Sequence, residues 1–271
     1  MPELPEVETV KNGLIKKVKG KKITNCKVLW DGIIAYPSTK DFIKEIENQT
    51  INDITRKGKF LMFILDDYYL ISHLRMEGKY FIKEPSSPLS KHDHVIFTLD
   101  NKEELRYNDT RKFGKMHLVK KDELEKSPIF KLGKEPWDKD LTTAYLKEKL
   151  NRKLAIKTLL LDQSIITGIG NIYADEILFA SKINPKTSGC NLTNKNLQDI
   201  IDNTKTILER AIKLGGTTIH TYTAVDGITG RFQQELLVHG KKDEPCPNCK
   251  SKIAKIVVNT RGTYYCPKCQ K

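Results

Sequence analysis

Residues 50–107 read TINDITRKGKFLMFILDDYYLISHLRMEGKYFIKEPSSPLSKHDHVIFTLDNKEELRY. This stretch divides into short runs rich in β-branched and aromatic residues, which are separated by turn signals at 57–58, 66–67 and 100–101. Strands are expected at residues 50–56, 59–65, 68–76, 79–83, 94–100 and 104–107. Short strands at such spacing are typical of a β-sandwich.

The flanking segments extend the prediction to an α+β fold. Before the strands, residues 4–18 carry apolar positions at helical spacing, residues 21–30 alternate like a strand, and residues 39–47 resemble a short amphipathic helix. After them, Gly and Pro interrupt the pattern at 131–138. Helices are then expected at 142–150, 154–163, 170–181 and 193–214. We therefore predict an N-terminal β-sandwich domain at 1–133, a helical domain at 134–235 and a zinc finger at 236–271.

The charge balance points to a polyanionic partner. The 271 residues include 47 Lys and Arg against 34 Asp and Glu, so the formal net charge is 47 − 34 = +13. Nucleic acid is favoured over a membrane because no stretch approaches 18 apolar residues. The N-terminus also lacks the apolar core of a signal peptide, which favours a soluble cytoplasmic protein.

Four of the six cysteines form a metal-binding pattern. Cys246, Cys249, Cys266 and Cys269 make two C-x2-C pairs separated by 16 residues. This spacing predicts one structural Zn²⁺ held by four thiolates. Cys26 and Cys190 stand alone and are expected to be packed or inert thiols.

The first eight residues, MPELPEVE, combine a proline with three carboxylates. If Met1 is removed, Pro2 becomes a free secondary amine, and a terminal amine is partly unprotonated near neutral pH. Such an amine can form a Schiff base with a sugar aldehyde. The alternative is a simple helix start, in which Pro5 occupies the first turn and Glu6 faces the positive end of the helix dipole.

Together, several motifs resemble the bacterial formamidopyrimidine-DNA glycosylases in order and spacing. They are MPELPEVETV at the N-terminus, the Lys-Gly-Lys turn at 57–59, HLRMEGKY at 73–80, KHDHV at 91–95, DTRKFG at 109–114, GIGNIYADE at 168–176 and the four-cysteine module. The resemblance covers the whole chain. Leu4 favours this branch over the endonuclease VIII-like branch, which usually has Gly there.

The resemblance implies a bifunctional enzyme that excises oxidised purines from duplex DNA and nicks the abasic site. Pro2 would attack C1′ of the sugar, Glu3 would act as general acid and base, and Glu6 would help to hold the site. Lys59 would assist β-elimination, whereas a lone Lys at a turn is otherwise a solvated charge. Arg261 would complete δ-elimination, or would make an ordinary phosphate contact.

The resemblance also implies how a base leaves the stack. Met76, Arg111 and Phe113 match an intercalating triad in which apolar side chains replace the lost stacking and Arg111 bonds the widowed base. The alternative for Met76 and Phe113 is core packing. Lys112 stands where the family often has a second Arg, which keeps the charge but loses a planar donor fork.

Four residues match positions that contact the DNA backbone, namely His92, Arg111, Arg152 and Asn171. Asn171 starts an expected helix, where backbone N–H groups suit a phosphate. The 217–229 segment resembles a lid that closes over the extruded base. His73 and His94 are expected to be structural.

The sequence therefore predicts a monomeric, cytoplasmic DNA repair enzyme with a helix–two-turn–helix motif, acting on double-stranded DNA that contains oxidised purines or abasic sites in a cleft between its domains. Two alternatives stay open. One is the same fold acting on oxidised pyrimidines, and the other is a non-enzymatic, zinc-dependent DNA-binding protein.

Overall fold

A computed structural model describes residues 1–217 and 230–271, and contacts between residues group them into two units. The first unit consists of Met1–Phe130 joined by Thr217 and Gly230, and the second of Lys131–Gly216 and Arg231–Lys271. The predicted division at 133 and 235 into three domains stays a prediction. Most of the expected lid, residues 218–229, lies outside the described residues.

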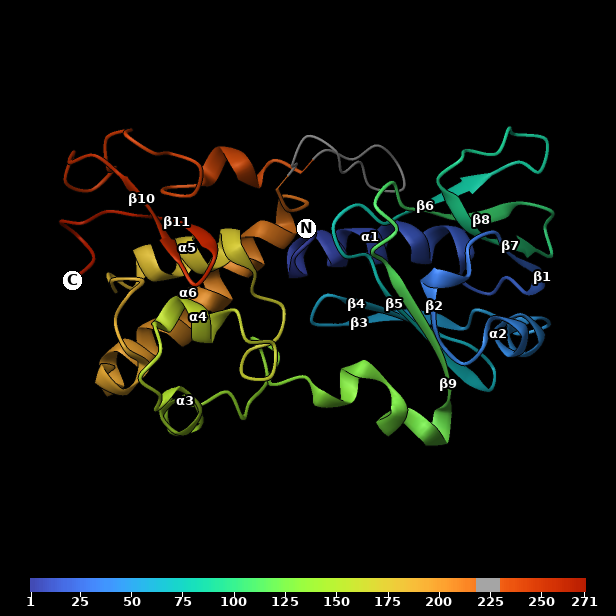
Figure 1. The fold of residues 1–271 in the computed structure, drawn as a ribbon, viewed down its shortest axis with the longest axis horizontal. Coiled ribbons are helices and arrows are strands. Elements are labelled where there is room, and N and C mark those ends of the chain that lie inside the picture. Colours follow the sequence, from blue (N-terminus) through green and yellow to red (C-terminus); the bar gives the residue numbers. More distant parts are fainter. Residues whose placement is uncertain (218–229) are drawn as a thin grey trace. The chain divides into compact units, whose positions relative to one another are not determined.

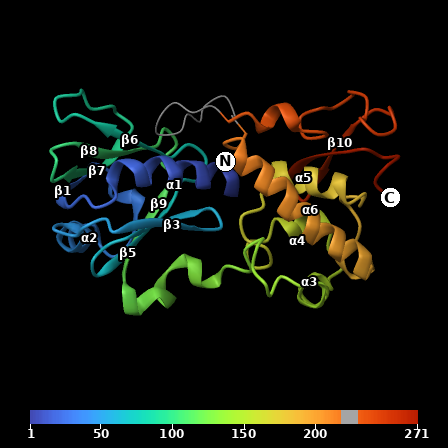
Figure 2. The ribbon, with the colours of Figure 1, turned by 180° about the vertical axis from the view of Figure 1, so that it is seen from behind.

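The strands of the first unit form two sheets, which Figures 1 and 2 show as separate layers. The five-stranded sheet has the order β2-β9-β5-β4-β3, with β2 Ile34–Tyr36, β9 Lys115–Lys120, β5 Tyr68–His73, β4 Phe60–Ile64 and β3 Asp53–Lys57. The four-stranded sheet has the order β1-β7-β8-β6, with β1 Ile23–Val28, β7 Asp93–Leu99, β8 Glu104–Asn108 and β6 Lys79–Lys83.

Side-chain alternation places the core between these sheets. In β4, Leu61 and Phe63 are fully buried, while the residues on either side of each are partly exposed. Phe97 and Leu105 from the other sheet join the same hydrophobic cluster. The predicted β-sandwich is confirmed.

Two helices complete this core. Helix α1 (Leu4–Val18) buries the stripe that its sequence predicts, including Val7, Val10 and Leu14. Helix α2 (Thr39–Ile46) is capped by Ser38, whose hydroxyl accepts a hydrogen bond from the Asp41 N–H at 3.2 Å. The unit is thus a β-sandwich with helices packed on it.

The second unit is mainly helical. Its helices are α3 Thr143–Leu150, α4 Ile156–Leu160, α5 Asn171–Ala180 and α6 Asn194–Lys213. The sequence predicted all four, and α4 is shorter than expected. Helix α6 starts at a capping box, because Thr193 Oγ1 accepts from the Asn196 N–H at 3.2 Å and Asn196 Oδ1 accepts from the Thr193 N–H at 3.0 Å. Strands β10 (Ala254–Val258) and β11 (Arg261–Tyr265) form a hairpin next to α5.

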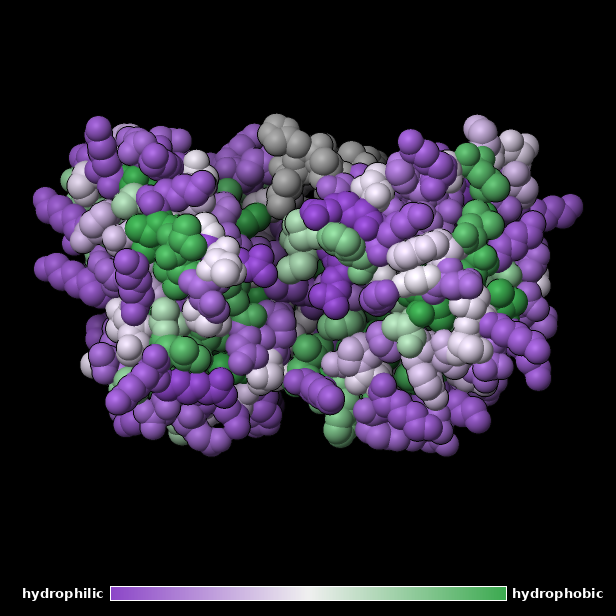
Figure 3. Space-filling model, in the orientation of Figure 1, coloured by the Kyte–Doolittle hydropathy of each residue, from purple (hydrophilic) through white to green (hydrophobic). Residues whose placement is uncertain are grey.

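Short 3₁₀ helices connect the main elements, at Asp31–Ile33, Lys121–Lys126, Pro128–Lys131, Gly189–Asn191 and Phe232–Glu235. Among the described residues, we find no helix long and apolar enough to cross a membrane. Hydrophilic residues predominate on the face of each unit shown in Figure 3, in keeping with the net charge.

Candidate active site and nucleic-acid interface

The start of α1 gathers the predicted acid and base residues. Glu3 is the N-cap of α1, and Glu6 completes a capping box in which its Oε2 accepts from the Glu3 N–H at 2.8 Å. Glu3 is only 3% exposed and Glu6 only 5%. The helix-start alternative and the functional interpretation therefore describe the same geometry. The cap holds two carboxylates in place beside the buried Pro2.

The second oxygen of Glu6 binds a residue far along the chain. Its Oε1 accepts from the Thr217 N–H at 2.7 Å and from the Thr217 hydroxyl at 3.0 Å. Thr217 is itself buried and is the first residue of the segment predicted to be a lid. With three hydrogen bonds accepted, the Glu6 carboxylate is suited to holding the site rather than to transferring protons.

Lys59 lies in the β3–β4 turn and is 5% exposed, so the alternative of a solvated surface charge is wrong. Two bonds from Arg56 hold this turn against α1. Arg56 Nε donates to Glu8 Oε2 at 2.9 Å, and its NH1 donates to the Gly58 carbonyl at 3.0 Å. Glu8 thus anchors the turn. Burial opposes ionisation of this carboxyl, but its ion pairs with Lys11 and Arg56 lower its pKa overall.

Burial and the charges of this cluster shift the pKa of the terminal amine. Burial lowers the pKa of the Met1 α-amine below its ordinary 8.0, because the charged form loses hydration. The carboxylates of Glu3 and Glu6 oppose this shift, and the positive charge of Lys59 adds to it. After removal of Met1 the amine would belong to Pro2, which is one residue closer to Glu3 along the chain. The site therefore favours a terminal amine that is neutral, as nucleophilic attack requires.

His73 also faces this cluster, which the sequence did not indicate. Its pKa is lowered from 6.5 to about 3 by burial, with further effects from the charges of Arg75 and Lys59. Its Nδ1 accepts from the Arg75 N–H at 2.9 Å, so the neutral ring carries its proton on Nε2. The feature that places His73 beside the cluster is the strand register, which pairs His73 with Phe60, the neighbour of Lys59. His94 is structural as expected, because it is buried with Nε2 2.8 Å from the Asp109 carbonyl.

The predicted intercalating residues are exposed. Met76 is 38% exposed and Phe113 is 49% exposed, so the alternative that they pack in the core is wrong. The guanidinium carbon of Arg111 lies 4.7 Å from the centre of the Phe113 ring. The structure thus brings Arg111 and Phe113 together in one exposed loop between β8 and β9.

The predicted backbone-contact residues occur in both units. In the first unit, His92 is partly exposed in the loop before β7. In the second, Arg152 is exposed and its NH1 lies 3.8 Å from Asp162 Oδ2. Asn171 is the first residue of α5, and its Nδ2 donates to the Gly262 carbonyl at 3.0 Å. Its buried Oδ1 has no hydrogen-bond partner within residues 1–217 and 230–271.

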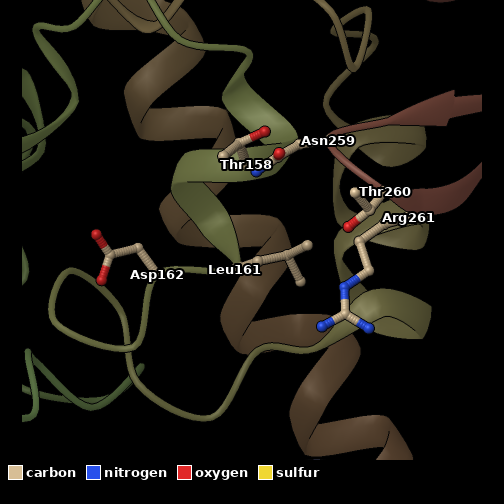
Figure 4. A pocket seen from close by; sticks show the side chains of 6 residues that line it. All are labelled: Thr158, Leu161, Asp162, Asn259, Thr260 and Arg261. Carbon is tan, nitrogen blue, oxygen red and sulfur yellow. The ribbon is translucent and has the colours of Figure 1, made fainter.

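Arg261 starts β11 and lines a hollow of about 270 Å³ in the second unit (Figure 4). The hollow is lined by Thr158, Leu161, Asp162, Asn259, Thr260 and Arg261. The β10–β11 turn is tight, since Asn259 and Thr260 have φ of 44° and 66°. The carbonyl of Gly262 is held by Asn171 and by Lys157 Nζ at 3.2 Å, which fixes the start of β11 on the helices.

The four predicted metal ligands are gathered at one point. The sulfur atoms of Cys246, Cys249, Cys266 and Cys269 all lie within 4.8 Å of one another. Two of the separations, Cys246–Cys269 at 3.9 Å and Cys249–Cys266 at 3.5 Å, match the edge of about 3.8 Å that a tetrahedral site with 2.3 Å Zn–S bonds requires. The cluster therefore fits one structural Zn²⁺. Phe179 of α5 and Val238 pack against it.

Comparisons with known proteins agree with this arrangement. Residues 1–116 match the formamidopyrimidine-DNA glycosylase N-terminal domain, residues 132–223 its H2TH domain, and residues 243–271 the zinc finger found in FPG and IleRS. The chain is 47% identical to the formamidopyrimidine-DNA glycosylase of Bacillus subtilis over 273 residues, covering 100% of this chain and 99% of that protein. It is also 47% identical to that of Oceanobacillus iheyensis, covering 100% and 98%.

Solved structures of Lactococcus lactis Fpg are similar throughout. A mutant bound to DNA that contains Fapy-dG superimposes with a TM-score of 0.93 at 41% identity and covers 100% of both chains. A complex with DNA that contains an abasic site gives 0.92 at 41% identity and covers 99% of both. These matches extend over the sandwich, the helices and the cysteine module. The chain belongs to the formamidopyrimidine-DNA glycosylase family.

Proposed function

We propose that this chain is a bifunctional DNA glycosylase and abasic-site lyase that excises oxidised purines, formamidopyrimidines and 8-oxoguanine, from duplex DNA. One observation carries the proposal: buried Pro2, Glu3, Glu6 and Lys59 are gathered around the chain terminus. A DNA-binding protein without catalysis has no need for a cluster of buried charges. The activity fits a monomer in the bacterial cytoplasm, with the domains at 1–133, 134–235 and 236–271.

The first step replaces one bond to C1′ by another. The neutral Pro2 nitrogen attacks C1′, the glycosidic bond breaks, and the base leaves with the electron pair and takes up a proton. Glu3 moves the proton, since a carboxylic acid in a buried site can donate to a leaving group and then act as base. Glu6 keeps the helix start and Thr217 in place through its three accepted bonds. The amine then loses its proton, the C1′–O4′ bond breaks, and O4′ takes up a proton. The product is an iminium between Pro2 and the opened sugar.

Strand cleavage then follows as two eliminations. Loss of a C2′ proton expels the 3′ phosphate, and the Lys59 ammonium stabilises the developing negative charge. A second elimination, in which C4′ loses a proton, expels the 5′ phosphate, and Arg261 supplies a positive charge to the leaving phosphate. Water finally hydrolyses the iminium and releases Pro2. Zinc takes no part in these steps, because four thiolates leave no open position on the metal.

DNA binding uses side chains that are exposed or partly exposed. Met76 and Phe113 fill the gap left by the extruded nucleotide, and Arg111 bonds the unpaired base. His92, Arg152 and Asn171 contact phosphates and set the register of the duplex.

Oxidised pyrimidines are a second candidate substrate class. Lactococcus lactis Fpg, which is 40% identical to this chain, has been solved in complex with DNA that contains an oxidised pyrimidine. The two substrate classes are separated by measuring base release from matched duplexes that carry one formamidopyrimidine or one oxidised pyrimidine. We expect faster release of the purine-derived lesion.

The enzyme proposal is tested with a protein that begins at Pro2 and a control that is extended before Pro2. The first should release the base and cut the strand with loss of both phosphates. The extended control should bind lesion DNA and do neither. If the extended protein is fully active, another amine is the nucleophile. If neither protein acts on any lesion while both bind DNA, the chain is the non-enzymatic alternative.

A further inference from the structure

Two exposed loops carry the intercalating side chains, and the sheet registers place them side by side. Residues 74–78 leave the five-stranded sheet after β5 and enter the four-stranded sheet at β6. Residues 109–114 make the opposite crossing, from β8 to β9. Their ends are paired across the strands, since His73 pairs with Lys115 and Lys79 pairs with Asn108. We call these two segments the wedge loops.

A single side chain contacts both wedge loops at their closing glycines. Tyr107 of β8 is fully buried, and its hydroxyl lies so close to each glycine that a Cβ could not be accommodated. A Cβ on Gly78 would lie 2.2 Å from this oxygen, and a Cβ on Gly114 would lie 1.7 Å from it. Both loops therefore close directly on the Tyr107 hydroxyl.

Asp109 ties the second wedge loop to the same point. Its buried carboxylate accepts from the Arg111 N–H at 2.9 Å through Oδ1 and from the Gly114 N–H at 2.8 Å through Oδ2. The Tyr107 hydroxyl donates to the same Oδ2 at 3.5 Å. At the outer side, the Thr110 hydroxyl lies 3.4 Å from Glu77 Oε2, which links the two loops again.

We propose that Tyr107 is a positioning residue for base extrusion, because its hydroxyl, together with Asp109, sets the spacing of the two wedge loops. Met76 and Phe113 come from different loops, yet they must enter one gap in the base stack together. A buried hydroxyl seated between the two closing glycines holds the loops in one arrangement before DNA binds, so less ordering is needed at the moment of extrusion. This inference rests on the proposed function.

Packing alone would also bury Tyr107, and Tyr80 provides the control for that explanation. Tyr80 is 2% exposed, stacks edge-on against Tyr107 with ring centres 5.2 Å apart, and donates a hydrogen bond to Ser72 Oγ at 2.8 Å. Replacing either tyrosine by Phe removes one buried hydroxyl from the same core. Tyr107→Phe removes the oxygen that lies against both loop glycines, whereas Tyr80→Phe removes one that is bonded to Ser72.

The test compares wild type, Tyr107→Phe and Tyr80→Phe in three assays. The first is thermal unfolding, in which both variants should lose similar stability. The second is base release from a lesion duplex, which Tyr107→Phe should slow by about fivefold relative to Tyr80→Phe, the rate equivalent of one lost neutral hydrogen bond. The third is strand cleavage at a preformed abasic site, where no base must be unstacked. Here the two variants should agree within about twofold.

A double-mutant cycle shows whether Tyr107 acts through the wedge. In a Met76→Ala/Phe113→Ala background, Tyr107→Phe should cause no further loss of base release. A loss of the same size in that background would overturn the proposal, as would equal base release by Tyr107→Phe and Tyr80→Phe.

Helix opening is measured independently of chemistry, by the fluorescence of 2-aminopurine placed beside the lesion. We expect wild type and Tyr80→Phe to raise the signal more than Tyr107→Phe does. If wild type opens the helix but releases no base, the enzymatic proposal fails, and the fluorescence difference still decides the role of Tyr107. Equal fluorescence from all three proteins contradicts that role.

Discussion

Replacement of Phe113 by Ala separates an intercalating wedge from a structural core residue. Phe113 is 49% exposed, whereas Phe97 in the same unit is fully buried. Complete burial of a Phe side chain contributes about 1.5–3 kcal/mol, so half of that, about 1 kcal/mol, is at stake for Phe113. The contact with Arg111 adds about 0.5–1 kcal/mol at an exposed site. We therefore expect Phe113→Ala to lower the free energy of unfolding by no more than about 2 kcal/mol.

The control, Phe97→Ala, should cost about 3–5 kcal/mol because it leaves a cavity in the core. One kcal/mol shifts the melting temperature of a domain of this size by about 3–5 °C, so thermal unfolding distinguishes the two variants. In base release from a lesion duplex the order of the two variants should reverse, with the larger loss in Phe113→Ala. Extrusion costs a few kcal/mol that a wedge helps to offset, so Phe113→Ala should release a lesion base at least about tenfold more slowly than wild type.

Strand cleavage at a preformed abasic site should suffer less, because an abasic sugar has no base to unstack. Phe113 is a core residue and not a wedge if Phe113→Ala melts as low as Phe97→Ala while base release per folded molecule stays normal. Equal losses on the lesion duplex and on the abasic duplex would also exclude a wedge, since a wedge assists only the first.

Three further perturbations test the metal, the phosphate contacts and the buried histidine. Cys249→Ser should release zinc, loosen residues 240–271 and weaken DNA binding, so metal retention with unchanged affinity would contradict the four-thiolate site. Arg152→Ala should flatten the slope of log K against log salt by about 0.9 without changing lesion preference, while Lys195→Ala, an exposed control on α6, should leave the slope unchanged. His73, with a folded pKa of about 3 against 6.5 unfolded, binds a proton only in the unfolded chain between these values, so its contribution is complete above pH 6.5 and is lost as pH falls. Between pH 7 and pH 5 wild type should therefore lose about 2 kcal/mol more than His73→Gln in denaturant titrations, and identical pH dependences would exclude a buried neutral ring.

Periodicity predicted most of the elements because their burial is one-sided. Helix α6 and strand β4 both follow their hydrophobic patterns to within a residue or two of the predicted ends. The sequence did not predict strand β9, since Lys115–Lys120 follows directly on the DTRKFG motif with no turn signal between them, or β2, because three residues carry too little pattern. A strand of this kind is defined by the strands with which it pairs and not by its own sequence.

Motifs in the sequence indicated some of the candidate site residues. They did not indicate the residues that hold these side chains in place. Pro2, Glu3 and Glu6 stand close together in sequence, so their proximity follows from one helix start. The turn that carries Lys59 is held to α1 by the bond between Arg56 and Glu8, which are 48 residues apart, and no local pattern relates such residues. The position of Tyr107 between two loops likewise arises from the registers of two sheets.

In the proposed mechanism the Pro2 nitrogen forms the covalent bond to the sugar. Borohydride reduction of the protein on abasic-site DNA traps such an iminium as a stable amine, and peptide mass spectrometry locates it. We expect a single adduct on the N-terminal peptide that begins at Pro2, and no adduct for the extended control. An adduct on Lys59, or an adduct that persists in the extended protein, would contradict this mechanism.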